Sequence, residues 1–576
     1  MVQIVDDLCR MRMLMAGVYV GVAISSTYGF SLFTDHLREK YGMSQSDITT
    51  ISTVGNCVGY CSFLAGMLFD YAGPMVVFPL AGFLGFLGFL LFGLTFDDKI
   101  ANPTVIHFSI FNAILYLGCP AMDVATVMPL MMQFPMDRGY VVLIQKTFSG
   151  LGTSVLMAYF NGWFKSANSD NIKDNNYSGY AYFVGAQILL CSLVGTYFVR
   201  LPVYYPCAWR KKRLTAEEIT EREGTLELYM KQRAPSRRLK IGFALVVAVL
   251  IFSTTQSITT AYVKTSHSGY LAISVVAVLL MASFTAMALP FQFLGRYTPV
   301  RPTHMEVIGD TPNTPHDGVM NGDVCDANES PNAKGEEKPV LKPAPQYTGS
   351  FWANLLTVDL WAMWIACFGM WGTGTVMQMN AAQIYMSKNS GEKDTPTLTL
   401  YITIMAVGSA VGRMSMGFAD LKLAQWQRTG KSEMLMTFAL PLGSLCLFVA
   451  YLFFALLPQQ ALILPFFLGA FGNGAGWGVG VLAARMMYAK DIGKHYNFLF
   501  SSGIVSTIAL NRFMFGEMYD AQGRRRGEFP SCNAPVCVRN QMFVLMAVNL
   551  VAACAAAFVH WRFARFTKAE RERERD

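Results

Sequence analysis

The sequence is poor in charge and lacks the short patterns that mark nucleotide and metal sites. Charged residues make up 15% of its 576 residues, against about 25% in soluble domains. It contains no Gly-x-x-x-x-Gly-Lys loop, so direct ATP-driven pumping has no support. Its seven histidines form no His-x-x-x-His pair and no metal-ligand spacing, which argues against a metalloenzyme. We therefore expect no enzyme, no bound metal and no other cofactor.

The net charge of +8 does not indicate nucleic-acid binding. The lysines and arginines lie in short segments between apolar stretches, where they set the orientation of a chain in a membrane. The N-terminal segment Met1–Arg12 is too polar for a cleaved signal peptide. The first apolar stretch is therefore expected to act as an uncleaved membrane-targeting signal.

Apolar residues are abundant, at 53% of the chain. They gather into fourteen or so stretches in groups of six, two and six, each long enough for a hydrocarbon core about 30 Å thick. Their expected bounds are Met13–Phe33, Asp47–Phe69, Met75–Phe96, Val105–Met131, Tyr140–Trp163, Tyr180–Arg200, Ile241–Val263, Tyr270–Phe293, Phe351–Tyr385, Leu398–Leu421, Glu433–Leu457, Ala461–Tyr488, Tyr496–Phe515 and Gln541–Phe563. This pattern predicts an all-α polytopic membrane protein.

Polar segments divide the chain into blocks. A basic segment with an amphipathic run from Thr215 to Lys231 follows the first six spans, and a segment rich in Pro, Asn, Asp and Gly follows the two middle spans. The predicted blocks are a six-helix bundle over 1–200, a basic cytoplasmic linker over 201–240, two inserted transmembrane helices over 241–293, a disordered cytoplasmic loop over 294–350, a second six-helix bundle over 351–566 and a charged cytoplasmic tail over 567–576.

The two six-span blocks carry matching motifs. Gly66, Asp70 and Gly73 follow the second span of the first block, and Gly417 and Asp420 stand at the same place in the last block, about 350 residues later. The six-span block is therefore expected to be duplicated. Two parallel six-helix halves are the layout of major facilitator transporters.

Several short motifs carry a closer resemblance. They are Tyr28-Gly29-Phe30-Ser31, Tyr41-Gly42-Met43-Ser44-Gln45, Phe134-Pro135-x-x-Arg138-Gly139 with Lys146 and Gly150-Leu151-Gly152, Gly372-Thr373-Gly374 with Asn380, and Asp491-Ile492-Gly493-Lys494-His495-Tyr496-Asn497-Phe498. In these residues the chain resembles the nodulin-like branch of the major facilitator superfamily, and it is similar to monocarboxylate and oxalate–formate carriers. The resemblance implies a solute transporter and makes small organic anions the first substrates to test.

The loop after the second span departs from the superfamily pattern. Gly66, Asp70 and Gly73 match it, but Tyr71 replaces the usual arginine and Pro74 begins what is usually a basic end. Asp70 can still bond a neighbouring helix end and latch a cytoplasmic gate. The alternative is a plain helix-capping turn. Gly417 and Asp420 are the expected gate residues of the other half.

Two charged residues fall inside the first block. Asp123 lies about eight residues from the cytoplasmic end of the fourth span and Lys146 about seven from that of the fifth, so at 1.5 Å per residue they reach nearly equal depth. An isolated charge there costs at least about 2.5–3.5 kcal/mol, which favours pairing. They form either a structural ion pair or a coupling pair, in which protonation of Asp123 frees Lys146 to attract an anion.

Arg413, in the second span of the last block, is the predicted anion-binding residue. Arginine keeps its charge when buried and offers a fork that fits a carboxylate. The alternative is that its guanidinium binds Asp420 or carbonyls at a helix end.

Polar residues on the span Phe351–Tyr385 predict a lined cavity. Gln378, Asn380 and Gln383 offer donors there, and the paired glycines Gly372 and Gly374 allow the helix to bend or unwind. The alternative for the glycines is close helix packing. Tyr28 of the first span is expected to line the same cavity.

The distribution of basic residues predicts that both termini are cytoplasmic. That side collects roughly thirty lysines and arginines and the other roughly a dozen. Cys532 and Cys537 fall on the outer side, where they form a disulfide only if the compartment is oxidising.

We therefore interpret the chain as a secondary transporter of a small solute, most of all an organic anion such as a monocarboxylate, that works by alternating access, with proton coupling left open. We expect a monomer in contact with membrane lipids. The alternative is a non-transporting receptor or scaffold that binds partners through its cytoplasmic segments. The sequence does not identify the substrate or the membrane.

Overall fold

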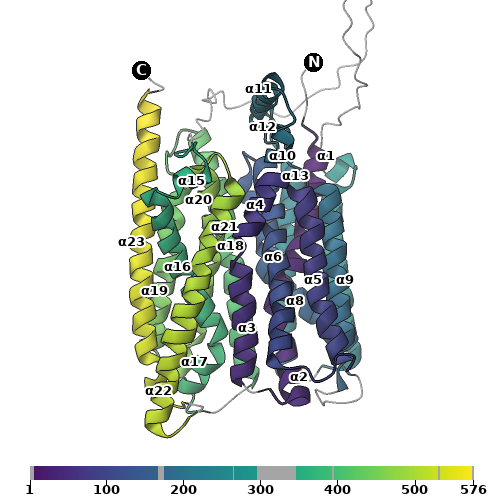
Figure 1. Ribbon diagram of the computed structural model, residues 1–576, viewed down its shortest axis with the longest axis vertical. Helices are drawn as coiled ribbons and strands as arrows, with labels where there is room; N and C mark the ends of the chain where they lie inside the picture. The colour runs from purple at the N-terminus through teal and green to yellow at the C-terminus, as the bar shows by residue number, and fades with distance from the viewer. Residues whose placement is uncertain are drawn as a thin grey trace, which may run out of the picture.

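The computed structural model is a helical bundle with both chain ends on one face (Figure 1). It describes residues 5–43, 45–166, 174–263, 265–294, 345–391, 395–529 and 532–573. Within these residues, 14 helical segments are long and apolar enough to cross a membrane, which confirms the predicted all-α polytopic fold. Most of the predicted disordered loop, residues 295–344, lies outside the described residues.

The first six spans form the first half of the molecule, and two of them are built from several helical pieces. The helices are α1 (Asp7–Ser25), η1 (Ser26–Phe30), α2 (Ser31–Tyr41), α3 (Gln45–Tyr60), α4 (Phe63–Ala72), α5 (Pro74–Phe96), α6 (Val105–Gln133), α7 (Arg138–Val141), η2 (Val142–Lys146), α8 (Thr147–Tyr159), η3 (Phe160–Phe164) and α9 (Tyr177–Phe198). The second span consists of α3 and α4, and the fifth runs from α7 through the π-helical turns η2 and η3.

The linker and the two inserted spans follow. Their helices are α10 (Ala208–Lys211), α11 (Ala216–Gly224), α12 (Leu226–Lys231), α13 (Ser236–Tyr262), α14 (His267–Ser283), η5 (Phe284–Ala288) and η6 (Gln292–Leu294). The predicted linker helix is thus divided in two at Thr225.

The last six spans form the second half. The helices are α15 (Phe351–Asn354), α16 (Val358–Met379), α17 (Ala381–Lys388), α18 (Thr395–Arg428), η7 (Met436–Ala439), α19 (Leu440–Leu456), η8 (Gln459–Ala461), α20 (Ile463–Met487), α21 (Ile492–Ser506), η9 (Thr507–Gly516), α22 (Glu517–Arg526) and α23 (Val536–Arg573). We call the face with both chain ends, α11 and α12 the termini face, and the face with α2, α17 and α22 the opposite face (Figure 1).

The first and last spans extend further toward the chain ends than the apolar pattern predicts. Asp6 caps α1 by accepting from the Leu8 and Cys9 amides, and Asp7 pairs with Arg10 one turn on, so the polar start is helical. At the other end, α23 continues through most of the predicted charged tail. Ion pairs within one turn, such as Arg573 with Glu570, support that extension.

The two inserted spans join both halves. Helix α14 packs on η3 and α8 of the first half, and α13 lies against α8 and also against α18 of the second half. At the termini face the fully buried Arg238 of α13 donates to the carbonyls of Met287, Leu289 and Phe291 at 2.7–2.8 Å. These carbonyls follow the end of α14, where no helical donor remains, so one guanidinium satisfies them.

Arg238→Met is expected to destabilise this corner, because it keeps the apolar stem but removes three charge-assisted hydrogen bonds. We expect a loss of about 2–4 kcal/mol in the free energy of unfolding, seen as a lower melting temperature in detergent. The neighbouring Arg237 is exposed, so Arg237→Met serves as the matched control. Equal melting temperatures for the two variants would contradict this role of Arg238.

Candidate functional site

A buried ionic group lies between the two halves. The Lys146 Nζ is 2.8 and 2.6 Å from the two carboxylate oxygens of Asp123, which confirms the predicted pairing. The two side chains are only 5% and 7% exposed. Tyr496 of α21, in the second half, completes the group: its hydroxyl accepts from Lys146 at 3.0 Å and donates to Asp123 at 3.1 Å. The coupling role of the pair stays a prediction.

The local backbone explains how Lys146 reaches this position. Lys146 ends the π-helical turn η2, which interrupts the fifth span four residues after the start of α7. Such turns insert one residue into a helix and redirect the side chains beside it, often at functional sites. Each charge then finds its partners inside the protein, as a buried ion pair requires.

A cluster of aromatic rings from the second half lies beside the ionic group. Trp371 of α16 and Trp477 of α20 stack face to face, with ring centres 4.2 Å apart and planes 4° from parallel. Phe500 of α21 lies 5.5 Å from Trp371 and 5.4 Å from Trp477. The Lys146 ammonium lies 5.9 Å from the Trp477 ring and 5.6 Å from the Tyr496 ring, within the range of a cation–π contact.

Arg413 lies beside the same group. It is 4% exposed, and its guanidinium occupies the space that a Cβ atom on Gly150 of α8 would fill. It is close enough to act electrostatically on Lys146 and Tyr496. The structure thus brings together two cations and one carboxylate, from both halves of the molecule.

The predicted lining residues of α16 and α17 lie toward the opposite face. Helix α16 runs unbroken through Gly372 and Gly374, where an added Cβ atom would meet Ser506 and Asn473. The glycines therefore serve close packing, and the unwinding that they could allow is absent from this helix. The break comes instead at Asn380, between α16 and α17.

Asn380 is held at that break. Its amide donates to the Val376 carbonyl at 2.8 Å and to Asn511 at 2.6 Å. Gln378 and Gln383 are partly exposed. Tyr28 lies in η1, but its side chain is outside the described part of the structure. Substrate contact by these four residues stays a prediction.

The predicted gate residues lie at contacts between the halves near the termini face. Asp70 of α4 accepts from the amides of Gly493 at 3.1 Å and Lys494 at 2.8 Å. These are the second and third residues of α21, where a capping side chain normally binds. Asp70 therefore caps a helix of the other half. An added Cβ on Gly66, one turn earlier, would lie 2.5 Å from the Gly493 carbonyl oxygen.

The duplicated motif forms a second crossing. An added Cβ on Gly417 of α18 would lie 2.5 Å from the carbonyl oxygen of Gly139 in α7. Asp420 is buried and close enough to Arg138 for their charges to interact. Gly73 serves a different purpose: its φ of +78° in the turn from α4 to α5 is a conformation that favours glycine. Both crossings bring backbones of the two halves into contact, so the structure is closed near its termini face.

The segment that precedes α15 is ordered beside these crossings. Tyr347 pairs by its backbone with residues 487–489, and its hydroxyl donates to the buried carboxylate of Asp359, which also binds Arg562 at 2.8 Å. Burial and the carboxylate raise the pKa of Tyr347 to about 12. Residues 345–350, predicted as part of the disordered loop, are therefore fixed to the second half.

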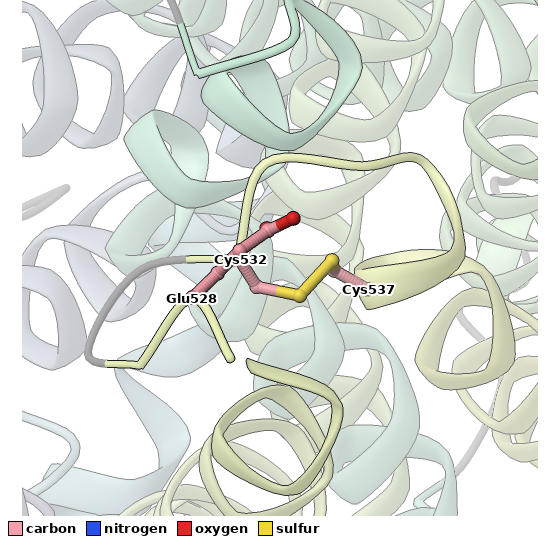
Figure 2. Close-up of side chains that lie close together, drawn as sticks. All are labelled: Glu528, Cys532 and Cys537. Atoms are coloured by element: carbon pink, nitrogen blue, oxygen red, sulfur yellow. A yellow bond between two sulfur atoms is a disulfide. The ribbon is translucent and has the colours of Figure 1, made fainter. Parts of the chain in front are cut away.

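Three groups with metal-ligand chemistry gather on the opposite face. Glu528, Cys532 and Cys537 lie close together between α22 and α23, and Figure 2 shows the two sulfur atoms bonded to each other. A disulfide offers no thiolate to a metal. The cluster is therefore read as a disulfide-closed loop.

The comparisons with known proteins agree with this architecture. The sequence model of the Nodulin-like family matches residues 10–289, nearly half of the chain. The fold is similar to that of the proton:xylose symporter XylE bound to 6-bromo-6-deoxy-D-glucose, at 11% identity and a TM-score of 0.53, over 95% of this chain and 93% of that one. The E. coli fucose:proton symporter FucP is similar at 12% identity and a TM-score of 0.48, over 95% and 98% of the two chains. No protein of curated function matches the sequence significantly.

At these identities the solved structures show the fold alone, and that fold is the one of the major facilitator superfamily. The protein is an integral, multi-pass membrane protein with 14 candidate spans among its described residues.

Gly66→Ala is expected to weaken closure of the termini face, because the new Cβ meets a backbone oxygen that cannot move aside. Met75 and Leu356 are exposed and lie in opposite halves. Spin labels at these two positions report the distance between the halves by double electron–electron resonance. We expect the share of the longer distance to rise at least about fivefold. Gly224→Ala, with no atom within 4 Å of the added carbon, is the control. Identical distance distributions for the two variants would contradict the assignment of this crossing.

Proposed function

We propose that this protein is a secondary transporter that moves a small organic anion, of the monocarboxylate class, together with a proton by alternating access. The observation that carries the proposal is the group of Asp123, Lys146 and Tyr496, which is buried and shared between the two halves. Arg413 beside it adds a second cation. With one carboxylate and two cations, the group has one positive charge in excess, which one substrate anion would balance.

The chemistry of this group couples the proton to the anion. A proton on Asp123 alone leaves Lys146 buried without its counter-ion, which costs about 3–5 kcal/mol. A substrate anion that binds Lys146 and Arg413 supplies the missing negative charge. Proton and anion therefore favour each other's binding, and by linkage the effect is equal in both directions. The loaded site keeps the net charge of the empty one.

Tyr496 links this chemistry to movement. Its hydroxyl belongs to the second half but bonds both charged groups of the first. When Asp123 is protonated and Lys146 turns to a substrate, both bonds of that hydroxyl change. The contact between the halves is thereby altered at the centre of the bundle, while Asp70 and the glycine crossings hold the termini face.

The orientation of the chain is also a proposal. We place both termini in the cytoplasm because the basic residues concentrate on their side. The Cys532–Cys537 disulfide supports this placement, since it lies on the opposite face and disulfides persist in oxidising compartments. In this orientation the structure is closed toward the cytoplasm. A monomeric state is part of the same proposal.

Asp123→Asn is expected to abolish accumulation driven by a pH gradient, because the amide cannot take up the proton. Exchange of internal for external anion should persist, since Lys146 then has no competing carboxylate. Proteoliposomes loaded with a panel of two- to four-carbon monocarboxylates measure both. Asp97→Asn, which changes a carboxylate bonded to Tyr182 on the opposite face, is the control. An unchanged pH dependence in Asp123→Asn would remove this residue from coupling.

Arg413→Lys is expected to lower anion uptake at least about tenfold, equal to about 1.4 kcal/mol of binding, because lysine keeps the charge but not the two-pronged donor. Arg413→Gln should lower it further. The matched control is Arg512→Gln, which removes a guanidinium that pairs with Glu517 in an exposed position. If Arg413→Lys transports as fast as the unaltered protein, the guanidinium has no direct part in binding the carboxylate.

A further inference from the structure

The cap of α21 comes from another helix, although α21 has a capping residue of its own. Asp491 directly precedes the helix and is of a residue type that commonly caps. Its side chain makes no capping bond, because Asp70 of the first half occupies the amides of Gly493 and Lys494. Two carboxylates thus compete for one pair of amides.

Asp491 is held away from those amides by two other donors. One carboxylate oxygen accepts from the Phe351 amide at 2.9 Å, and the other from the Lys494 ammonium at 2.7 Å. Its φ and ψ are 50° and 42°, in the left-handed region, whereas a residue that caps with its side chain is usually extended. Burial alone would raise the pKa of Asp491, but these hydrogen bonds lower it, so the carboxylate is charged at neutral pH.

The donor Phe351 is itself placed between the two halves. Its ring is 1% exposed and lies 5.2 Å from Phe63 of the first half, 5.1 Å from His495 and 5.6 Å from Phe498. When the halves separate on this face, Phe351 loses its contact with Phe63. The bond that restrains Asp491 is therefore part of the closed arrangement.

We propose that Asp491 is a positioning residue of the termini-face gate: it binds Phe351 while the gate is closed, and it takes over the amides of Gly493 and Lys494 from Asp70 when the gate opens. The inference rests on the alternating access proposed above. Departure of Asp70 would otherwise leave the positive end of α21 without an acceptor. Exchange of one carboxylate for another keeps those amides bonded in both states, so the gate opens without losing its cap.

Hydrogen exchange at the Gly493 and Lys494 amides, resolved to single residues by mass spectrometry, tests the exchange of caps. If the two carboxylates replace each other, Asp70→Ala alone and Asp491→Ala alone should each speed exchange less than about threefold. The double variant should speed it at least about thirtyfold. Asp491→Asn in the Asp70→Ala background should behave like Asp70→Ala, because asparagine caps as well as aspartate.

A purely structural role of Asp491 predicts a different hydrogen-exchange result. If Asp491 only shapes the turn, Asp70→Ala alone deprotects both amides fully, and the second substitution adds nothing. That outcome would overturn the proposal.

A second measurement covers the case in which the double variant does not fold. Phe351→Pro removes the amide hydrogen that holds Asp491, and Ser350 before it is already extended, as proline requires. Phe351→Ala removes the same ring but keeps that hydrogen. With spin labels at Met75 and Leu356, we expect a share of the open distance at least about threefold higher for proline than for alanine. Equal shares would overturn the proposal, whereas a single distance in the unaltered protein would contradict alternating access itself.

Discussion

The structure depends most on a constraint set by the membrane: charges inside the bundle must find partners inside the protein. Asp123 and Lys146 meet that requirement as an ion pair within the first half, and Tyr496 of the second half bonds both of them only when the two halves are together. Any event that changes the charge of the group also changes the contact between the halves. A proton or an anion can therefore act on the arrangement of the whole molecule.

The termini face obeys a related constraint at its helix ends. Four glycines allow two pairs of backbones to touch across the halves, and Asp70 accepts from two amides at the start of α21 that have no acceptor within the helix. These contacts place backbones close together and a carboxylate at the positive end of a helix. They must also be reversible, and a second carboxylate at Asp491, held by Phe351, gives the helix end an alternative partner. Helix α21 carries both Tyr496 of the central group and the amides that Asp70 caps.

The sequence predicts much of the fold, because span length and the duplicated motifs are properties of the chain itself. The depth of Asp123 and Lys146 was sufficient to predict their contact, since antiparallel neighbours meet at equal depth. Tyr496 was missed, although it lies 350 residues after Lys146, at the offset of the repeat. That offset was a usable signal. Trp371 and Trp477 gave none, because an aromatic residue in an apolar span has the same pattern whether it faces lipid or a partner ring.

Other features depend on partners that a local pattern does not contain. Gly372 and Gly374 suit a bend and a close packing contact equally well, and only the positions of Ser506 and Asn473 decide for packing. Asp491 is of a residue type that commonly caps helices, yet Asp70, more than 400 residues earlier in the chain, bonds the amides at the start of α21 instead. The most direct test of the account is the ratio of protons to anions moved in proteoliposomes, followed with a trapped pH dye while a monocarboxylate gradient drives uptake. The account predicts one proton taken up with each anion. Anion movement without a proton, or no movement of any monocarboxylate, would contradict it.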